Sequence, residues 1–229
     1  MTVATESLSD GSYKLKIFNL SSNLLTHTLI GSTVGVTVLF AFRNGLPLSQ
    51  INLHIVLCVI GYQLLMAQGF LALAPENSWS TVLRLVDRRR AHWVLQVMGS
   101  GLAIAGSAIG IQTKSVHWNS LHGQFALVAL VFTCASLVNG LSSLYAFELS
   151  KRIRLPPNLS KVPHILFGVV AFVAASISLC YGYDKNSFKN WIHPKLAVTA
   201  IVFTAIFTFT IIINPMIVFF KKLKDSFSK

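Results

Sequence analysis

The chain has 229 residues, of which 53% are hydrophobic and only 11% are charged. This composition excludes an ordinary soluble domain and is typical of a polytopic membrane protein. The formal net charge of +12 would suit nucleic-acid binding, but the basic residues gather in the connections between apolar segments, and we therefore expect no nucleic-acid partner.

Six apolar segments follow one another along the chain, and each is long enough to cross the hydrocarbon core of a membrane as a helix. They cover residues 23–42, 51–73, 91–111, 119–147, 163–183 and 194–220. The connections between them leave no room for a folded soluble domain. We therefore predict an all-α fold, a six-helix transmembrane bundle over residues 23–220, with tails at 1–22 and 221–229.

Residues that favour turns separate these segments. The first segment ends at Arg43-Asn44-Gly45-Leu46-Pro47, and the second ends at Ala74-Pro75-Glu76-Asn77. Pro156-Pro157 breaks the connection ahead of the fifth segment. Pro194 is expected in the first turn of the last helix, where its missing N–H costs nothing.

The distribution of Lys and Arg predicts the orientation in the membrane. With the N-terminus in the cytosol, the opposite side receives only five basic residues, which are Arg43, Lys114, Lys185, Lys189 and Lys195. The cytosolic side receives the other 14 of the 19. Because cytosolic loops carry an excess of basic residues, we predict that both tails are cytosolic. The N-terminal tail lacks a cleavable signal pattern. We expect an endomembrane, such as the endoplasmic reticulum or a vesicle, rather than the plasma membrane.

A histidine lies near the start of each of the four middle segments: His54, His92, His122 and His164. Because successive spans run in opposite directions, His54 and His122 share one membrane face, and His92 and His164 share the other. A lone histidine in a span is most often a packed, hydrogen-bonded residue, although ionisable groups in a membrane are costly and indicate function. Two histidines that face each other in a bundle can supply both axial ligands of a haem iron. The pattern predicts two bis-histidine haems, one near each face.

Small residues occupy seven of the eight positions that lie seven or fourteen residues after a histidine, close to one helical face. The eight positions are Gly61, Gln68, Gly99, Gly106, Ala129, Ser136, Ala171 and Ser178. A seam of small residues lets helices approach closely in lipid, and it equally leaves room for a flat macrocycle. Fourteen residues of helix rise about 20 Å, so haems at the two faces would be close enough for electrons to cross the interior.

These motifs together resemble the cytochrome b561 family, in particular its short branch of proteins that are little more than the membrane domain. The residues that carry the resemblance are His54 with Val56, Gly61 and Tyr62, the basic residues ahead of His92, Asn119-Ser120-Leu121-His122-Gly123, and His164 with Gly168 and Phe172. The resemblance covers approximately residues 20–220. The chain departs from the classical branch after the second span, where it reads Leu71-Ala72-Leu73-Ala74-Pro75-Glu76 instead of an aliphatic-Tyr-Arg sequence.

The resemblance implies that the second to fifth helices enclose two b-type haems. His54 and His122 would ligate the non-cytosolic haem, and His92 and His164 the cytosolic one. It also implies a transmembrane reductase that takes electrons from cytosolic ascorbate and passes them to monodehydroascorbate or ferric iron on the lumenal or extracellular side. Family members are often dimers, which makes a homodimer one expectation.

Several residues are candidates for substrate binding. On the cytosolic side these are five arginines, Arg88, Arg89, Arg90, Arg152 and Arg154. They could bind an anionic donor through charge-assisted hydrogen bonds, or simply orient the protein and contact lipid phosphates. On the other side, His117 could help to bind an acceptor near His122, or be an ordinary interfacial histidine. His27 and His193 have no equally placed partner.

Two functions from other classes fit part of the pattern. A histidine-lined metal or proton transporter would need acidic co-ligands within the spans, and only Glu148 comes close. A quinol-linked haem subunit that anchors a soluble partner agrees with the short loops. The chain has no Ser-His-Asp, Walker or GxGxxG pattern, so hydrolase and nucleotide chemistry have no support.

Overall fold

The computed structural model describes residues 10–145 and 157–227. Six of its helices are long and apolar enough to cross a membrane: Gly11–Phe42, Gln50–Leu71, Leu85–Gln112, Leu121–Leu144, Lys161–Tyr183 and Pro194–Ser226. The predicted all-α fold with six membrane spans is therefore confirmed.

The helices, in chain order, are α1 (Asp10–Phe42), α2 (Gln50–Cys58), the π-helix η1 (Val59–Met66), α3 (Ala67–Leu71), α4 (Leu85–Gln112), α5 (Leu121–Leu144), α7 (Pro157–Tyr183), α8 (Asn186–Ile192) and α9 (Pro194–Phe227). The segments α2, η1 and α3 follow one another without a break and form the second span. The first and last helices are longer than their apolar segments, because α1 begins within the sequence expected as a tail and α9 continues into the C-terminal tail.

Local signals in the sequence mark where the helices begin. Ser49 and Ser120 cap α2 and α5, since each side chain accepts a hydrogen bond, from Asn52 N and Gly123 N respectively, at 3.3 Å. Pro194 is the first residue of α9, as predicted. Gly45, with a φ of 76°, supplies the left-handed conformation in the turn after α1.

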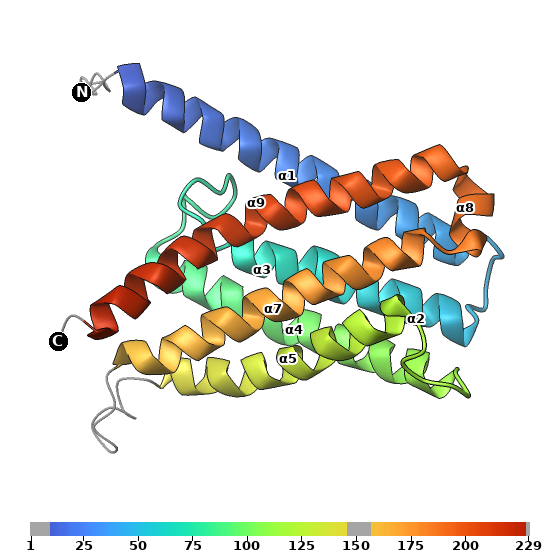
Figure 1. The fold of residues 1–229 in the computed structure, drawn as a ribbon. Coiled ribbons are helices and arrows are strands. Elements are labelled where there is room, and N and C mark those ends of the chain that lie inside the picture. Colours follow the sequence, from blue (N-terminus) through green and yellow to red (C-terminus); the bar gives the residue numbers. More distant parts are fainter. Residues whose placement is uncertain (1–9, 146–156, 228–229) are drawn as a thin grey trace.

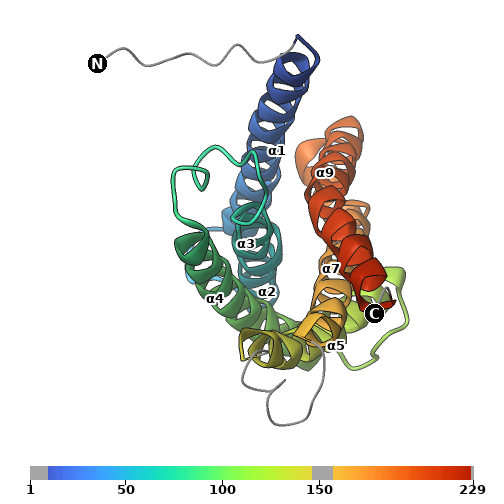
Figure 2. The ribbon, with the colours of Figure 1, turned by 90° about the vertical axis from the view of Figure 1, so that its left-hand side faces the viewer.

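The six spans run alternately in opposite directions, so that the start of α1 and the end of α9 lie at the same end of the bundle (Figure 1). The 72–84 loop lies at this end too, and α8 lies at the opposite end. Seen along the spans, α1, α2 and α4 lie on one side and α5, α7 and α9 on the other (Figure 2). The closest packing joins α5 to α7, and α2 with η1 to α4. The molecule thus contains two tight helix pairs.

An apolar cluster is buried where α1, the second span, α7 and α9 meet. Leu29, Ile30, Val59, Phe172 and Phe207 form one buried cluster that draws side chains from α1, η1, α7 and α9. Large apolar side chains on the outer faces of the spans are exposed, as expected for a surface that contacts lipid.

Glycines allow the closest helix crossing. A Cβ on Gly61 would lie 2.7 Å from Gly99 O, and a Cβ on Gly99 would lie 2.8 Å from Gly61 O. The seam of small residues therefore serves close packing at this level of the bundle, which is one of its two expected roles.

Candidate functional site

Two of the four histidines face each other at the end of the bundle that carries α8. His54 comes from α2 and His122 from α5. Their ring centres lie 6.3 Å apart, and their planes are nearly perpendicular, at 86°.

The other two histidines face each other at the opposite end, near the 72–84 loop. His92 comes from α4 and His164 from α7. Their ring centres are also 6.3 Å apart, with an interplanar angle of 90°. The two pairs thus have the same separation and the same crossed arrangement, although they share no residue.

Each of the four rings has its Nδ1 atom at hydrogen-bond distance from a backbone carbonyl oxygen. The bonds are His54 to Gly106 at 2.8 Å, His92 to Gly69 at 2.7 Å, His122 to Ser178 at 2.8 Å and His164 to Ser136 at 3.1 Å. Because a carbonyl oxygen can only accept, Nδ1 must carry the proton. In a neutral ring this leaves Nε2 with a free lone pair, which is the form of imidazole that ligates a metal.

The carbonyl bonds are reciprocal within each tight helix pair. Helix α4 supplies the Gly106 carbonyl to His54, and the second span supplies the Gly69 carbonyl to His92. In the same way, α5 and α7 exchange the carbonyls of Ser136 and Ser178. Each of these four spans therefore carries its own histidine near one end of the bundle. Near the other end, it supplies the backbone carbonyl that orients the histidine of its paired helix.

Small side chains surround the rings. A Cβ on Gly110 would lie 2.6 Å from Nδ1 of His54, and one on Gly140 would lie 3.1 Å from Cε1 of His164. A third glycine, Gly182, comes within ordinary contact of His122. Glycine at these positions leaves the space that the rings occupy.

The geometry of both pairs fits two imidazoles on opposite sides of one metal ion. Two metal–nitrogen bonds of about 2.0 Å, with about 1.15 Å from each nitrogen to its ring centre, give a separation of about 6.3 Å. Two neutral imidazoles suit the axial positions of a haem, whose macrocycle supplies the remaining ligands. Within residues 10–145 and 157–227, no group of three or more His, Cys, Asp or Glu could hold a bare metal ion.

A cavity adjoins the His54–His122 pair. Both histidines line it, together with mainly apolar residues that include Tyr62, Ala129 and Ala175. Pockets for cofactors are usually lined in this way, by apolar side chains with a few polar groups. The donor set and the space beside it are therefore compatible with a haem.

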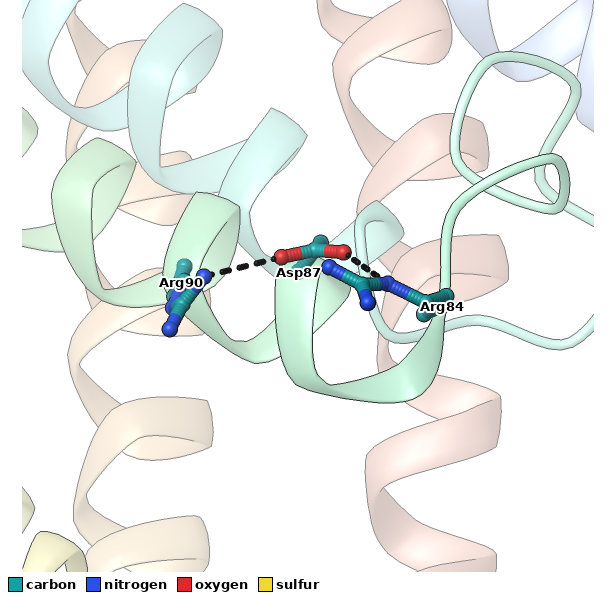
Figure 3. Close-up of polar contacts among 3 residues, drawn as sticks. All are labelled: Arg84, Asp87 and Arg90. Atoms are coloured by element: carbon teal, nitrogen blue, oxygen red, sulfur yellow. Dashed lines mark hydrogen bonds and ion pairs between the residues drawn. The ribbon is translucent and has the colours of Figure 1, made fainter.

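The arginines near His92 have different surroundings. Asp87 lies between Arg84 and Arg90, at 2.8 and 3.1 Å (Figure 3). Arg88 donates to the carbonyl oxygens of Ala72 and Ala74, at 2.9 and 2.5 Å. These bonds hold the start of the 72–84 loop against α4.

Arg89 is exposed to solvent. Arg152 and Arg154, which were predicted to lie on the same side, fall outside the described residues. Of the five candidate arginines, the structure therefore gives Arg88 a backbone role and Arg90 an acidic neighbour, and leaves Arg89 exposed.

A polar network joins α1 to the same loop, and the sequence did not indicate it. His27 Nε2 lies 2.9 Å from Asn77 Oδ1, and Gln68 Nε2 lies 3.1 Å from His27 Nδ1. Asn23 donates to the same Asn77 oxygen at 3.2 Å, and Trp79 donates to Gln68 at 3.0 Å. Asn77 is fully buried. His27 is thus hydrogen-bonded on both ring nitrogens.

The two remaining histidines lie at the other end of the bundle. His117 is exposed, and its ring centre lies 5.9 Å from that of Trp118. His193 connects α8 and α9, where its Nδ1 accepts from the Lys195 backbone N–H at 3.3 Å. Nearby, a shallow pocket is lined by residues that include His122, Asp184 and Lys185. Neither His117 nor His193 belongs to a facing pair.

Comparisons with known proteins agree with this arrangement. The model of the family described as eukaryotic cytochrome b561 matches residues 53–190, a range that contains all four facing histidines. The mouse protein named transmembrane reductase CYB561D2 is 29% identical over 181 residues, which cover 77% of this chain and 78% of the relative. The human and bovine proteins of the same name are each 30% identical over 153 residues, 65% of this chain and 68% of the relative. No solved structure matches the chain.

The family match covers more than half of the chain, and it falls on the second to fifth spans. Family membership implies b-type haem, and the relatives are named as reductases. This chain therefore belongs to the eukaryotic cytochrome b561 family, as a multi-pass membrane oxidoreductase that binds b-type haem.

Proposed function

We propose that the protein transfers electrons across the membrane through two b-type haems, one held by His54 and His122 and the other by His92 and His164. The observation that carries this proposal is the identical 6.3 Å separation in both pairs, together with a carbonyl acceptor for every Nδ1. A histidine that merely packs in a core needs neither feature.

The protein's own groups orient and tune the ligands. Bound haem supplies a centre that accepts and gives up one electron at a time. The carbonyls of Gly69, Gly106, Ser136 and Ser178 hold each Nδ1 proton, which fixes the ring orientation and makes Nε2 a better ligand. The hydroxyls of Ser178 and Ser136 also lie 3.2 Å from His122 Nδ1 and 3.4 Å from His164 Nδ1, so each of these two rings has a second polar contact.

Buried side chains lie between the two histidine levels. Tyr62 and Thr133 lie between the histidine levels of their helices, and their hydroxyls are 3.2 Å apart in a buried position. Ala129 and Ala175 pack beside Tyr62. We therefore expect electrons, rather than ions or a mobile carrier, to cross this region.

We infer that the end with His92, His164 and the arginines faces the cytosol, together with both termini. This orientation puts 14 of the 19 basic residues on the cytosolic side. The exposed Arg89 and the two arginines around Asp87 give this end a net positive charge, which would attract an anion such as ascorbate. We therefore take cytosolic ascorbate as the donor.

The acceptor side is also basic. Lys185 and Lys114 lie close enough to interact electrostatically with His122, and Lys185 lines the shallow pocket beside that ring. An anionic acceptor, either monodehydroascorbate or a ferric chelate, would be drawn to this surface. His117 belongs to the loop at the same end and is the further candidate for contact with the acceptor.

Haem counting on the purified protein tests the proposal. A reduced-minus-oxidised spectrum of a b-type cytochrome, with two haems per chain, is expected. Absence of haem from a well-folded preparation would favour a histidine-lined transporter. Haem reduced by a quinol but not by ascorbate would favour a quinol-linked anchor subunit. Reduction by ascorbate in proteoliposomes, followed by oxidation with ferricyanide on the opposite side, is the result that the proposal requires.

A further inference from the structure

The four reciprocal carbonyl bonds have nearly the same spacing along the chain. In three helices the acceptor lies fourteen residues after the helix's own histidine: Gly106 after His92, Ser136 after His122 and Ser178 after His164. In the second span the acceptor is Gly69, fifteen residues after His54. This span therefore contains one residue more than its three counterparts.

An additional residue would disturb a regular α-helix. Each residue turns the helix by about 100° and advances it by 1.5 Å. If the second span were an uninterrupted α-helix, the Gly69 carbonyl would be rotated about 100° further around the helix axis, relative to His54, than the acceptor carbonyls of the other three helices are relative to their own histidines. The bond to His92 could not form while His54 faced His122.

The π-helix η1 lies between these two residues, from Val59 to Met66. A π-turn closes its hydrogen bond from i to i+5 rather than from i to i+4, and so accommodates one residue more in the turn. We propose that η1 is a one-residue register correction that lets His54 and the Gly69 carbonyl serve the two facing pairs at once. The proposal rests on haem ligation by these pairs, as proposed above.

The surroundings of η1 agree with a positioning role. The second span contains no proline, so the usual cause of an irregular helix is absent. Gly61 in η1 makes the close crossing with Gly99. The Tyr62 hydroxyl accepts a hydrogen bond from Thr133, and Gln63 Nε2 donates to Ser176 at 3.4 Å. The wider turn therefore faces α4, α5 and α7, the three helices that carry the other histidines.

Deletion of a single residue tests the correction. Deleting Ile60 shortens the spacing from His54 to Gly69 to fourteen residues, so the span can close as an α-helix with both groups in place. We expect this variant to keep both haems. Deleting Val131 from α5, a residue that is 54% exposed, shortens the spacing from His122 to Ser136 to thirteen. This control should lose at least one haem, because no π-turn is present there to absorb the change.

The measurements are the haem-to-protein ratio and the electron paramagnetic resonance signal of each low-spin haem, and neither depends on activity. Deletion of Leu64, also within η1, provides a second chance for the variant to fold. Loss of haem from both η1 deletions, or failure of both to accumulate in the membrane, would overturn the proposal. So would retention of two haems when Val131 is deleted. Lack of haem in the unaltered protein would instead refute the proposed function.

Discussion

The Nδ1 atom of His92 donates a hydrogen bond to the backbone carbonyl oxygen of Gly69, 2.7 Å away. The residue that orients the ring thus contributes no side chain, and the same is true of Gly106 towards His54. Backbone acceptors cannot be deleted by substitution, but the space around the ring can be changed. Crowding a ring is therefore the direct way to test whether its orientation matters.

Replacing Gly110 by alanine should displace the His54 ring, because the new Cβ would lie 2.6 Å from its Nδ1. We expect the haem of the His54–His122 pair to be lost or to shift in midpoint potential, while the other haem is unchanged. Gly101→Ala on the same helix is the matched control, since its Cβ would meet nothing within 4 Å. Redox titration of both variants measures the effect. Identical behaviour of the two would contradict a steric role for Gly110.

The arginines should separate into two kinds. Arg89→Gln removes an exposed charge and should raise the KM for cytosolic ascorbate while kcat and haem content stay close to normal, as expected for lost binding energy. Arg88→Gln removes the donors to Ala72 and Ala74, at a cost of about 1 kcal/mol in local stability. It should speed proteolysis of the 72–84 loop. Initial rates at several ascorbate concentrations and limited proteolysis measure the two effects, and unchanged donor kinetics for Arg89→Gln would leave that residue only a topological role.

Replacement of His27 by alanine should loosen the same loop without loss of haem. The substitution removes the hydrogen-bond partner of Gln68 Nε2 and one of the two donors to Asn77 Oδ1, and the loss of a hydrogen bond costs about 1 kcal/mol. Hydrogen exchange of the 72–84 backbone should become faster than in the control Thr28→Ala, whose exposed hydroxyl bonds only to the preceding turn. Loss of a haem from His27→Ala would contradict this structural role.

Much of the fold follows from local signals, and much of the site does not. The apolar segments and Pro194 indicate the helices because each acts within a few residues of itself. The alternation of spans also brings His54 towards His122. Composition and periodicity are sufficient for these features, since the membrane imposes helices of a known length.

Contacts made by the backbone, or between residues far apart in the sequence, could not be predicted from local sequence patterns. The seam of small residues was interrupted at Gln68, and the structure shows why, since the acceptor in that span is Gly69. The one additional residue of the second span, which η1 accommodates, is not visible in the amino-acid composition of that span. The bonds of His27 to Gln68 and Asn77 join residues 41 and 50 positions apart, which no periodic pattern encodes.

The pairing of the histidines gives the most direct prediction. His54→Ala and His122→Ala should each lose the haem on the α8 side and keep the other, whereas His92→Ala and His164→Ala should do the reverse. The two ring centres within a pair are 6.3 Å apart, but the two levels are separated by about 20 Å of helix, so a histidine of one pair cannot replace a missing ligand of the other pair.

Double substitutions within a pair should be little worse than single ones, because one missing axial ligand already removes most of the site. Each variant should retain one haem that its own substrate can still reduce or oxidise, but it should lose electron transfer across the membrane. Haem content and spectra of the four variants provide the measurement, and loss of the same haem from His54→Ala and His92→Ala would show that the pairing is wrong.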